Sequence, residues 1–163
     1  MVNFRDMPRL VDVSQVAGAR LIPLKKHGDA RGWLIELFRA DELPDGFLPQ
    51  MGYISLTSPG IVRGPHEHRE QTDGFAFLSG EMELILWKRE GPDEIHRSVH
   101  RVGEEAPHFV LVPPGVVHAY RNVGPTDALV LNFPNQLYAG WGRGEPVDET
   151  RHELDPESPF LLP

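Results

Sequence analysis

Residues 63–88 read RGPHEHREQTDGFAFLSGEMELILWK, and this stretch decides the fold of the chain. Polar and apolar residues alternate for several positions of Glu81–Lys88, which is typical of a β-strand with one face in water. The pair Ser79-Gly80 marks a turn, so we expect a hairpin joining this strand to the apolar run before it. Similar runs recur along the chain: Tyr53–Thr57, Phe75–Leu78, Ile95–Val102, Phe109–Val112 and Ala128–Phe133. The pattern predicts an all-β antiparallel sandwich or barrel.

The chain has 163 residues and a mass of 18.3 kDa, the size of one ordinary domain. We therefore expect a single domain over residues 1–163, with a core at about 50–135. Glycine and proline, 16 of each, are scattered and indicate turns rather than a linker. The C-terminal tail is expected to pack on the core through three anchors: Trp141, Phe160 and Leu161. Two short helices are also expected: Ser14–Gly18 and Arg39–Leu43.

Charge and composition exclude several functional classes. Asp and Glu number 24 against 16 Lys and Arg, and the net charge of -8 argues against a general nucleic-acid binder. No apolar run approaches the length of a membrane span. Cysteine is absent, which excludes disulfides, thiol catalysis and thiolate metal sites. The charged N-terminal sequence does not read as a signal peptide, so we expect a cytoplasmic protein that binds neither membrane nor nucleic acid.

Two spaced motifs supply side chains of the kind that bind metals. His66 and His68 are two residues apart, so on a strand their side chains leave the same face. Asp73 follows where the chain returns on a neighbouring segment, and His118 follows a Pro-Gly turn at the start of a later strand. Each residue alone is unremarkable, but together they predict a site where the four converge. Three imidazoles and a carboxylate suit a divalent cation such as Fe, Mn, Ni, Cu or Zn.

These motifs resemble those of the cupin superfamily, whose fold is a small jelly-roll barrel built from two antiparallel sheets. Metal-binding cupins use two histidines, a glutamate and a later histidine. The matching residues here are His66, His68, Asp73 and His118, with the shorter aspartate in place of glutamate. The resemblance implies a cupin-type jelly roll with these four residues as metal ligands.

A second resemblance covers the chain from about Asp29 to Tyr138. Three segments are similar to motifs of the dTDP-4-dehydrorhamnose 3,5-epimerases: Asp29–Phe38, Ser55–His66 and Pro113–Tyr120. The resemblance implies an epimerase or isomerase that acts on a dTDP-linked 4-keto-6-deoxy sugar. It also implies proton abstraction next to the ketone, no organic cofactor, and a homodimer whose N-terminal strands are exchanged.

The same resemblance implies roles for individual residues. Arg31 would hold the diphosphate and Arg63 would face the diphosphate and sugar, because a guanidinium group can bind two phosphate oxygens at once. Glu36 falls where the family contacts the nucleoside across the dimer. His66 falls on the histidine that removes the proton.

The chain departs from that family at several catalytic positions. His68 replaces a glutamine, Asp73 replaces a lysine, and Asn132 stands near a tyrosine that reprotonates the sugar. A C-terminal aspartate that pairs with the catalytic histidine has no evident counterpart. We therefore name Tyr120 as the candidate acid, His68 or His118 as the partner of the base, and Asn132 as a substrate-binding residue.

Three alternatives remain open at this point. The run Arg63–His68 also fits the Arg-Gly-x-His-x-His run of the dTDP-sugar 3,4-ketoisomerases, so the sequence does not separate epimerase from ketoisomerase. The four-ligand pattern also fits a metal-dependent cupin enzyme that acts on another small molecule. The altered catalytic set fits a cupin that binds a sugar nucleotide without catalysis.

Overall fold

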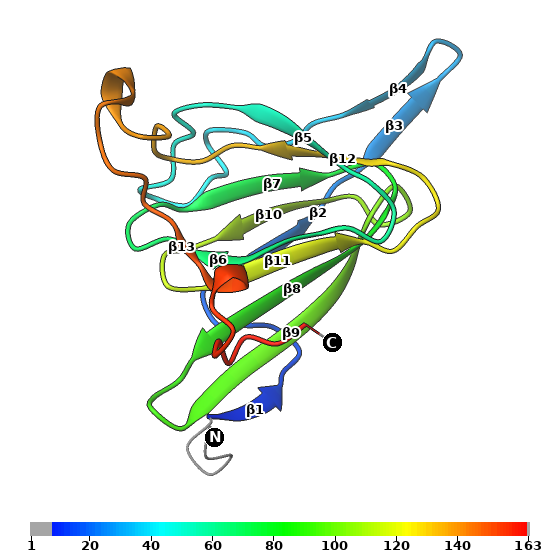
Figure 1. Cartoon of the computed structure of the whole chain (residues 1–163). Coiled ribbons are helices and arrows are strands. Elements are labelled where there is room, and N and C mark those ends of the chain that lie inside the picture. Colours follow the sequence, from blue (N-terminus) through cyan, green and yellow to red (C-terminus); the bar gives the residue numbers. More distant parts are fainter. Residues whose placement is uncertain (1–7, 163) are drawn as a thin grey trace.

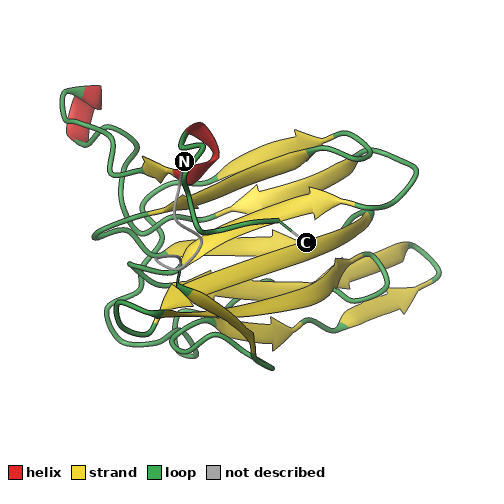
Figure 2. Cartoon of the chain, turned by 60° about the horizontal axis from the view of Figure 1, so that its bottom comes forward, coloured by secondary structure: helices red, strands yellow, loops and turns green. Residues whose placement is uncertain are grey.

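The computed structural model describes residues 8–162, which form two sheets packed face to face with a small separate hairpin (Figures 1 and 2). One sheet has the order β1 (Arg9–Asp12), β9 (Glu94–Gly103), β8 (Glu81–Arg89), β11 (Val117–Asn122), β6 (Val62–Glu67) and β13 (Thr150–Arg151). The other has the order β2 (Arg20–Pro23), β10 (His108–Val112), β7 (Asp73–Phe77), β12 (Ala128–Asn132) and β5 (Tyr53–Thr57). The hairpin consists of β3 (Lys26–Asp29) and β4 (Gly32–Ile35). Apart from the parallel pair of β1 and β9, the paired strands are antiparallel.

The expected all-β fold is confirmed, and each apolar run quoted above lies in a strand except for the last residues of two runs, Leu78 and Phe133. The expected hairpin at Gly80 is wrong, because β7 and β8 belong to different sheets and the turn between them crosses from one to the other. The two expected helices are also absent from the described residues. Arg39–Leu43 forms a single turn, in which the backbone N–H groups of Glu42 and Leu43 both donate to the Arg39 carbonyl. Among the described residues, no helix has the length and apolar character that a membrane crossing needs.

The main core lies between the two sheets. Phe75 and Phe77 of β7 pack there with Met82, Leu84 and Leu86 of β8. The other side chains of β8 were expected to face water, but the strand is buried from Met82 to Trp87. This expectation fails because the outer face of the sheet is covered: the Phe160 ring packs against Trp87, with 6.4 Å between ring centroids.

The C-terminal tail crosses the barrel and ends against the outside of the six-stranded sheet (Figure 1). Of its three expected anchors, only Phe160 is buried, with 7% of its surface exposed. Trp141 is 87% exposed and Leu161 is 59% exposed, so neither anchors the tail in this chain. Trp141 instead lies in the short helix η1 (Trp141–Arg143), which projects from the barrel. A second short helix, η2 (His152–Leu154), follows β13.

The hairpin of β3 and β4 extends away from the barrel (Figure 1). Trp33 and Leu34 on it are 59% and 64% exposed, and the Lys26 ammonium lies 5.0 Å from the centre of the Trp33 ring. Ile54 and Leu56, on edge strand β5, are 63% and 49% exposed. The hairpin and this sheet edge therefore leave a considerable apolar surface uncovered in a single chain.

Candidate active site

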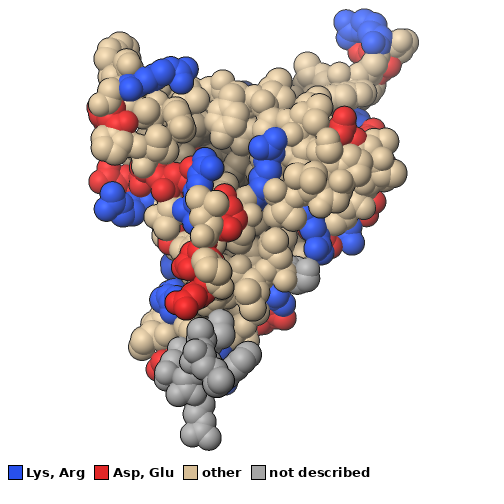
Figure 3. All heavy atoms as spheres, in the orientation of Figure 1, with Lys and Arg blue, Asp and Glu red and all other residues tan. Residues whose placement is uncertain are grey.

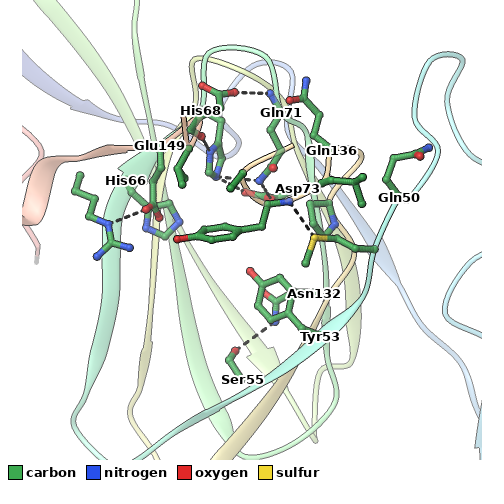
Figure 4. Close-up of a pocket in the computed structure, with 18 of the residues that line it drawn as sticks. Gln50, Tyr53, Ser55, His66, His68, Gln71, Asp73, Asn132, Gln136 and Glu149 are labelled. Atoms are coloured by element: carbon green, nitrogen blue, oxygen red, sulfur yellow. Dashed lines mark hydrogen bonds and ion pairs between the residues drawn. The ribbon is translucent and has the colours of Figure 1, made fainter. Parts of the chain in front are cut away.

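A cavity of about 940 Å³ opens between the two sheets and the tail. Its floor comes from β5, β6, β7, β11 and β12, and residues of the segment 134–153 form one wall. Its volume is typical of sites that enclose a whole small-molecule ligand. Figure 3 shows the hollowed face, with acidic and basic side chains gathered around it, and Figure 4 shows the side chains that line the cavity.

The four residues of the two sequence motifs cluster at this cavity: His66, His68 and Asp73 line it, and His118 is buried directly beside them. One potential ligand atom from each lies within 4.8 Å of those of the others. His66 and His118 are direct neighbours in the register of β6 and β11, and Asp73 begins β7 in the facing sheet. A glycine makes the close approach of β6 and β11 feasible, because a Cβ atom at Gly64 would lie 2.5 Å from the His118 carbonyl oxygen.

Backbone carbonyls orient two of these imidazoles. The Nδ1–H of His68 donates to the carbonyl oxygen of Asp148, and the Nδ1–H of His118 donates to that of Val116 at 3.1 Å. The Nε2 atoms of His68 and His118 consequently face the Asp73 carboxylate, at 3.0 Å and 3.3 Å from Oδ2. His118 Nε2 is fully buried and makes no hydrogen bond within the described part of the chain. Gln71 Nε2 donates to the other oxygen of Asp73 at 2.8 Å.

These environments give His66 and His68 different protonation states when no metal is bound. Burial, together with the nearby His118 and His68, lowers the pKa of His66 to about 3. Burial acts to lower the pKa of His68, but the hydrogen bond with Asp73, the negative charges of Asp73 and Glu149 and the bond with the Asp148 carbonyl together outweigh burial and raise the pKa to about 9. Burial would raise the pKa of Asp73, but its contacts with His118 and His68 hold it below the usual range. A neutral His66 therefore lies beside an ion pair between His68 and Asp73.

All three tyrosines of the chain line this cavity: Tyr53, Tyr120 and Tyr138. The Tyr120 hydroxyl lies deep in the site, where it shares a hydrogen bond of 3.0 Å with the Ser55 hydroxyl. Tyr53 is the direct cross-strand partner of Asn132, and both side chains are directed toward the cavity (Figure 4). Burial raises the pKa of both Tyr53 and Tyr120, so both phenols remain protonated near neutral pH.

Of the expected substrate-binding residues, Arg63 and Asn132 line the cavity. Arg63 is oriented by two donated hydrogen bonds, from Nε to the Thr57 hydroxyl at 3.0 Å and from Nη2 to the Leu56 carbonyl at 2.6 Å. Arg31 and Glu36 do not line it in a single chain. Arg31 stands at the tip of the β3–β4 hairpin, where its side chain is 90% exposed and paired with Asp29.

The tail supplies residues that sequence reasoning missed. Strand β13 aligns Arg151 with His66, and Arg151 Nε donates to the Glu149 carboxylate at 2.7 Å beside the histidine cluster (Figure 4). The Asp148 carboxylate accepts three backbone N–H groups at 2.9–3.0 Å, from Arg69, Glu70 and Gln71. A two-residue strand is too short for a hydrophobic pattern, so no pattern in the sequence predicts this wall. Tyr53, by contrast, lies in a strand that was expected.

The chain matches the family described as "Polysaccharide biosynthesis C-terminal domain" over residues 27–141. It is 30% identical over 147 residues to the spore coat polysaccharide biosynthesis protein SpsL of Bacillus subtilis, covering 88% of this chain and 93% of that protein. It is also 30% identical over 135 residues to the probable low-salt glycan biosynthesis epimerase Agl13 of Haloferax volcanii, covering 81% and 83%.

Solved structures share the fold. A dTDP sugar isomerase from Desulfovibrio desulfuricans G20 superposes with a TM-score of 0.74 at 23% identity, covering 90% of this chain and 91% of that one. The dTDP-6-deoxy-D-glucose-3,5-epimerase RmlC from Legionella pneumophila, in complex with dTDP-4-keto-L-rhamnose, superposes with a TM-score of 0.73 at 21% identity, covering 92% and 81%. These likenesses confirm the expected cupin-type jelly roll.

Proposed function

The chain belongs to the polysaccharide biosynthesis C-terminal domain family, and on that premise we propose that it is an epimerase or isomerase of a dTDP-linked 4-keto-6-deoxy sugar. The observation that carries the proposal is a neutral imidazole, His66, in the wall of a cavity large enough for a sugar nucleotide. The relatives support it, since one is named an epimerase and the structural neighbours are named for dTDP sugars.

In the proposed reaction, His66 removes the proton on a carbon next to the ketone. The electron pair of the broken C–H bond moves toward the ketone oxygen and gives an enolate, which needs nearby donors or positive charge. Arg63 and Asn132 are candidates for that contact, because both line the same cavity. A proton returned to the opposite face of the same carbon gives the epimer. Protonation at the former carbonyl carbon gives the shifted ketone, as the hydroxyl proton on the first carbon moves to the enolate oxygen.

We assign the returning proton to Tyr53 rather than to Tyr120, which the sequence suggested. Tyr120 is 4% exposed and its hydroxyl is held by Ser55, whereas Tyr53 is 49% exposed and reaches the cavity from β5 (Figure 4). Tyr53 lies directly across from Asn132, the position where the resemblance expected a tyrosine. The phenol is thus supplied by the neighbouring strand.

The assembly that we propose is a homodimer. The exposed apolar residues of the β3–β4 hairpin and of the β5 edge would be covered by a second copy. Arg31 and Glu36, which do not reach the cavity of their own chain, would then serve the cavity of the partner. The absence of cysteine is in keeping with a location in the reducing cytoplasm.

One observation favours a second candidate, a metal-dependent enzyme. The Nε2 atom of His118 is buried without a hydrogen bond and faces Asp73, while backbone carbonyls orient both His68 and His118. Carbonyl-oriented imidazoles around a buried carboxylate form a suitable donor set for a borderline divalent cation. His66, His68, Asp73 and His118 would hold it, and it would supply a Lewis acid for the ketone oxygen. His66 would then be a ligand and could not serve as the base.

Solvent exchange tests both versions. The protein, purified without a histidine tag, is incubated in D₂O with a dTDP-linked 4-keto-6-deoxy sugar, with and without a chelator. Deuterium that enters next to the ketone despite the chelator supports His66 as the base. Exchange abolished by the chelator, with stoichiometric metal in the untreated protein, supports the metal-dependent enzyme. If the sugar nucleotide binds but its protons do not exchange, the result supports a non-catalytic binding protein.

A further inference from the structure

Residues Tyr138–Glu145, which contain η1 and are called the η1 arm below, form the outer part of the cavity wall. Trp141 at the tip is 87% exposed, more than any other large apolar side chain in the described residues. Tryptophan is normally well buried, because leaving so large an apolar surface in water is unfavourable. An exposed tryptophan at the mouth of a cavity therefore points to a ligand that covers it.

The η1 arm has a defined shape and is not a loosely attached end. Ala139 and Arg143 adopt left-handed φ angles of 57° and 61°, which residues other than glycine rarely do. The Glu145 N–H donates to the Ala139 carbonyl at 2.8 Å and closes the arm. The Glu145 side chain also packs over Gly140, where a Cβ atom would lie 2.2 Å from it. This backbone presents Trp141 and Arg143 outward.

Trp141 and Arg143, the two side chains at the tip, are suited to two different parts of the same kind of ligand. The exposed indole offers a flat apolar face, on which a nucleobase can stack. The Arg143 guanidinium makes no hydrogen bond or ion pair with any described residue, so its donors are free for a phosphate. A nucleoside diphosphate carries both features side by side. With a net charge of -8, the protein offers no long-range attraction for such an anion, so local contacts must supply it.

We propose that the η1 arm binds the nucleoside diphosphate end of the substrate, with Trp141 against the base and Arg143 on a phosphate. This assignment rests on the proposed function, in which the sugar lies at the histidine cluster on the cavity floor. It gives the nucleotide a contact within the same chain, independent of the β3–β4 hairpin. It also makes the η1 arm a determinant of which nucleotide sugars the protein accepts.

Calorimetric titration with dTDP tests the proposal on the full chain. Trp141→Ala is expected to weaken dTDP binding about 10-fold or more, as loss of one stacking partner does. Trp141→Phe keeps an aromatic face and should restore most of the affinity. Arg143→Gln is expected to weaken the binding of dTDP but not of thymidine. Leu154→Ala is the control, since it removes a 74% exposed apolar side chain of the tail that does not line the cavity. Thermal melts of all variants should coincide, because each replaced side chain is exposed.

The proposal is overturned if Trp141→Ala binds dTDP as the unchanged protein does, or loses no more affinity than Leu154→Ala. Its failure is distinguishable from that of the proposed function. If sugar protons exchange with D₂O but Trp141→Ala does not change the affinity for dTDP, the role of the η1 arm is refuted and the proposed enzyme activity is retained. If Trp141→Ala weakens dTDP binding but no sugar protons exchange, nucleotide binding by the η1 arm is supported and the proposed isomerase activity is refuted. With both intact, Trp141→Ala should raise KM for exchange and leave kcat nearly unchanged.

Discussion

Small differences of environment separate His66, in β6, from His68, which follows directly after the end of that strand. His68 has two acceptors, the Asp148 carbonyl on one ring nitrogen and the Asp73 carboxylate near the other. No hydrogen bond to His66 is made by the described residues, and the charged groups around it include Arg151. A buried imidazole without an acceptor stays neutral, which is the form that accepts a proton.

Tyr53→Phe is expected to separate the two halves of the proposed reaction. Removal of the hydroxyl leaves the base in place, so protons should still leave the sugar into D₂O. Product formation should fall by about 10²–10⁴-fold, the usual contribution of a general acid. NMR measurement of exchange and product in the same sample checks this. Tyr120→Phe is the control, and a larger loss in that variant would transfer the role to Tyr120.

Asp148→Ala tests the contact between tail and site. The change removes the acceptor of three backbone N–H groups, and we expect a loss of about 1–3 kcal/mol in unfolding free energy after allowance for partial solvent exposure. Activity should fall as well, because the same residue's carbonyl orients His68. Urea unfolding and exchange rates are the measurements. Asp155→Ala, which removes the acceptor of one N–H from Glu157, should change both much less.

At the level of elements, the sequence predicted those strands whose apolar runs were bounded by glycine or proline. The sequence mispredicted the pairing of β7 and β8, because a glycine turn such as the one at Gly80 is compatible both with a hairpin and with a crossover between sheets. It also mispredicted the wet face of β8, since the covering residue, Phe160, lies far along the chain. The four clustered residues were predictable from spacing alone. Glu149 and Arg151 were not, because long-range pairing with β6 brings them to the site.

Phe160→Ala tests how firmly the tail is held. The ring packs between Trp87 and His152, at 6.4 Å and 4.6 Å between ring centroids. We expect a loss of about 3–5 kcal/mol in unfolding free energy, as for other buried phenylalanines. The neighbouring Leu161 is 59% exposed, so Leu161→Ala should change stability by less than about 0.5 kcal/mol. Equal losses in the two variants, measured by urea unfolding, would contradict this account of the tail.

For the whole molecule, the exposed apolar residues of the hairpin and the β5 edge predict a homodimer. Light scattering at micromolar concentration should give about twice the chain mass of 18.3 kDa. Replacing Leu34 and Ile54 by charged residues should shift the protein to monomers, because both are more than 60% exposed and are expected in the interface. If the unchanged protein has the mass of a single chain, the proposal that the partner's Arg31 and Glu36 contribute to the site is refuted.

The whole account depends on one chemical event, the removal by His66 of a proton next to the ketone. The most direct measurement is deuterium entry into a dTDP-linked 4-keto-6-deoxy sugar in D₂O, with chelator-treated protein, for the unchanged chain and for His66→Asn. Calorimetry with dTDP confirms that both bind the nucleotide. The account predicts rapid exchange with the unchanged chain and a loss of about 10²–10⁴-fold with His66→Asn. Exchange that survives in His66→Asn, or is absent from both proteins, would contradict it.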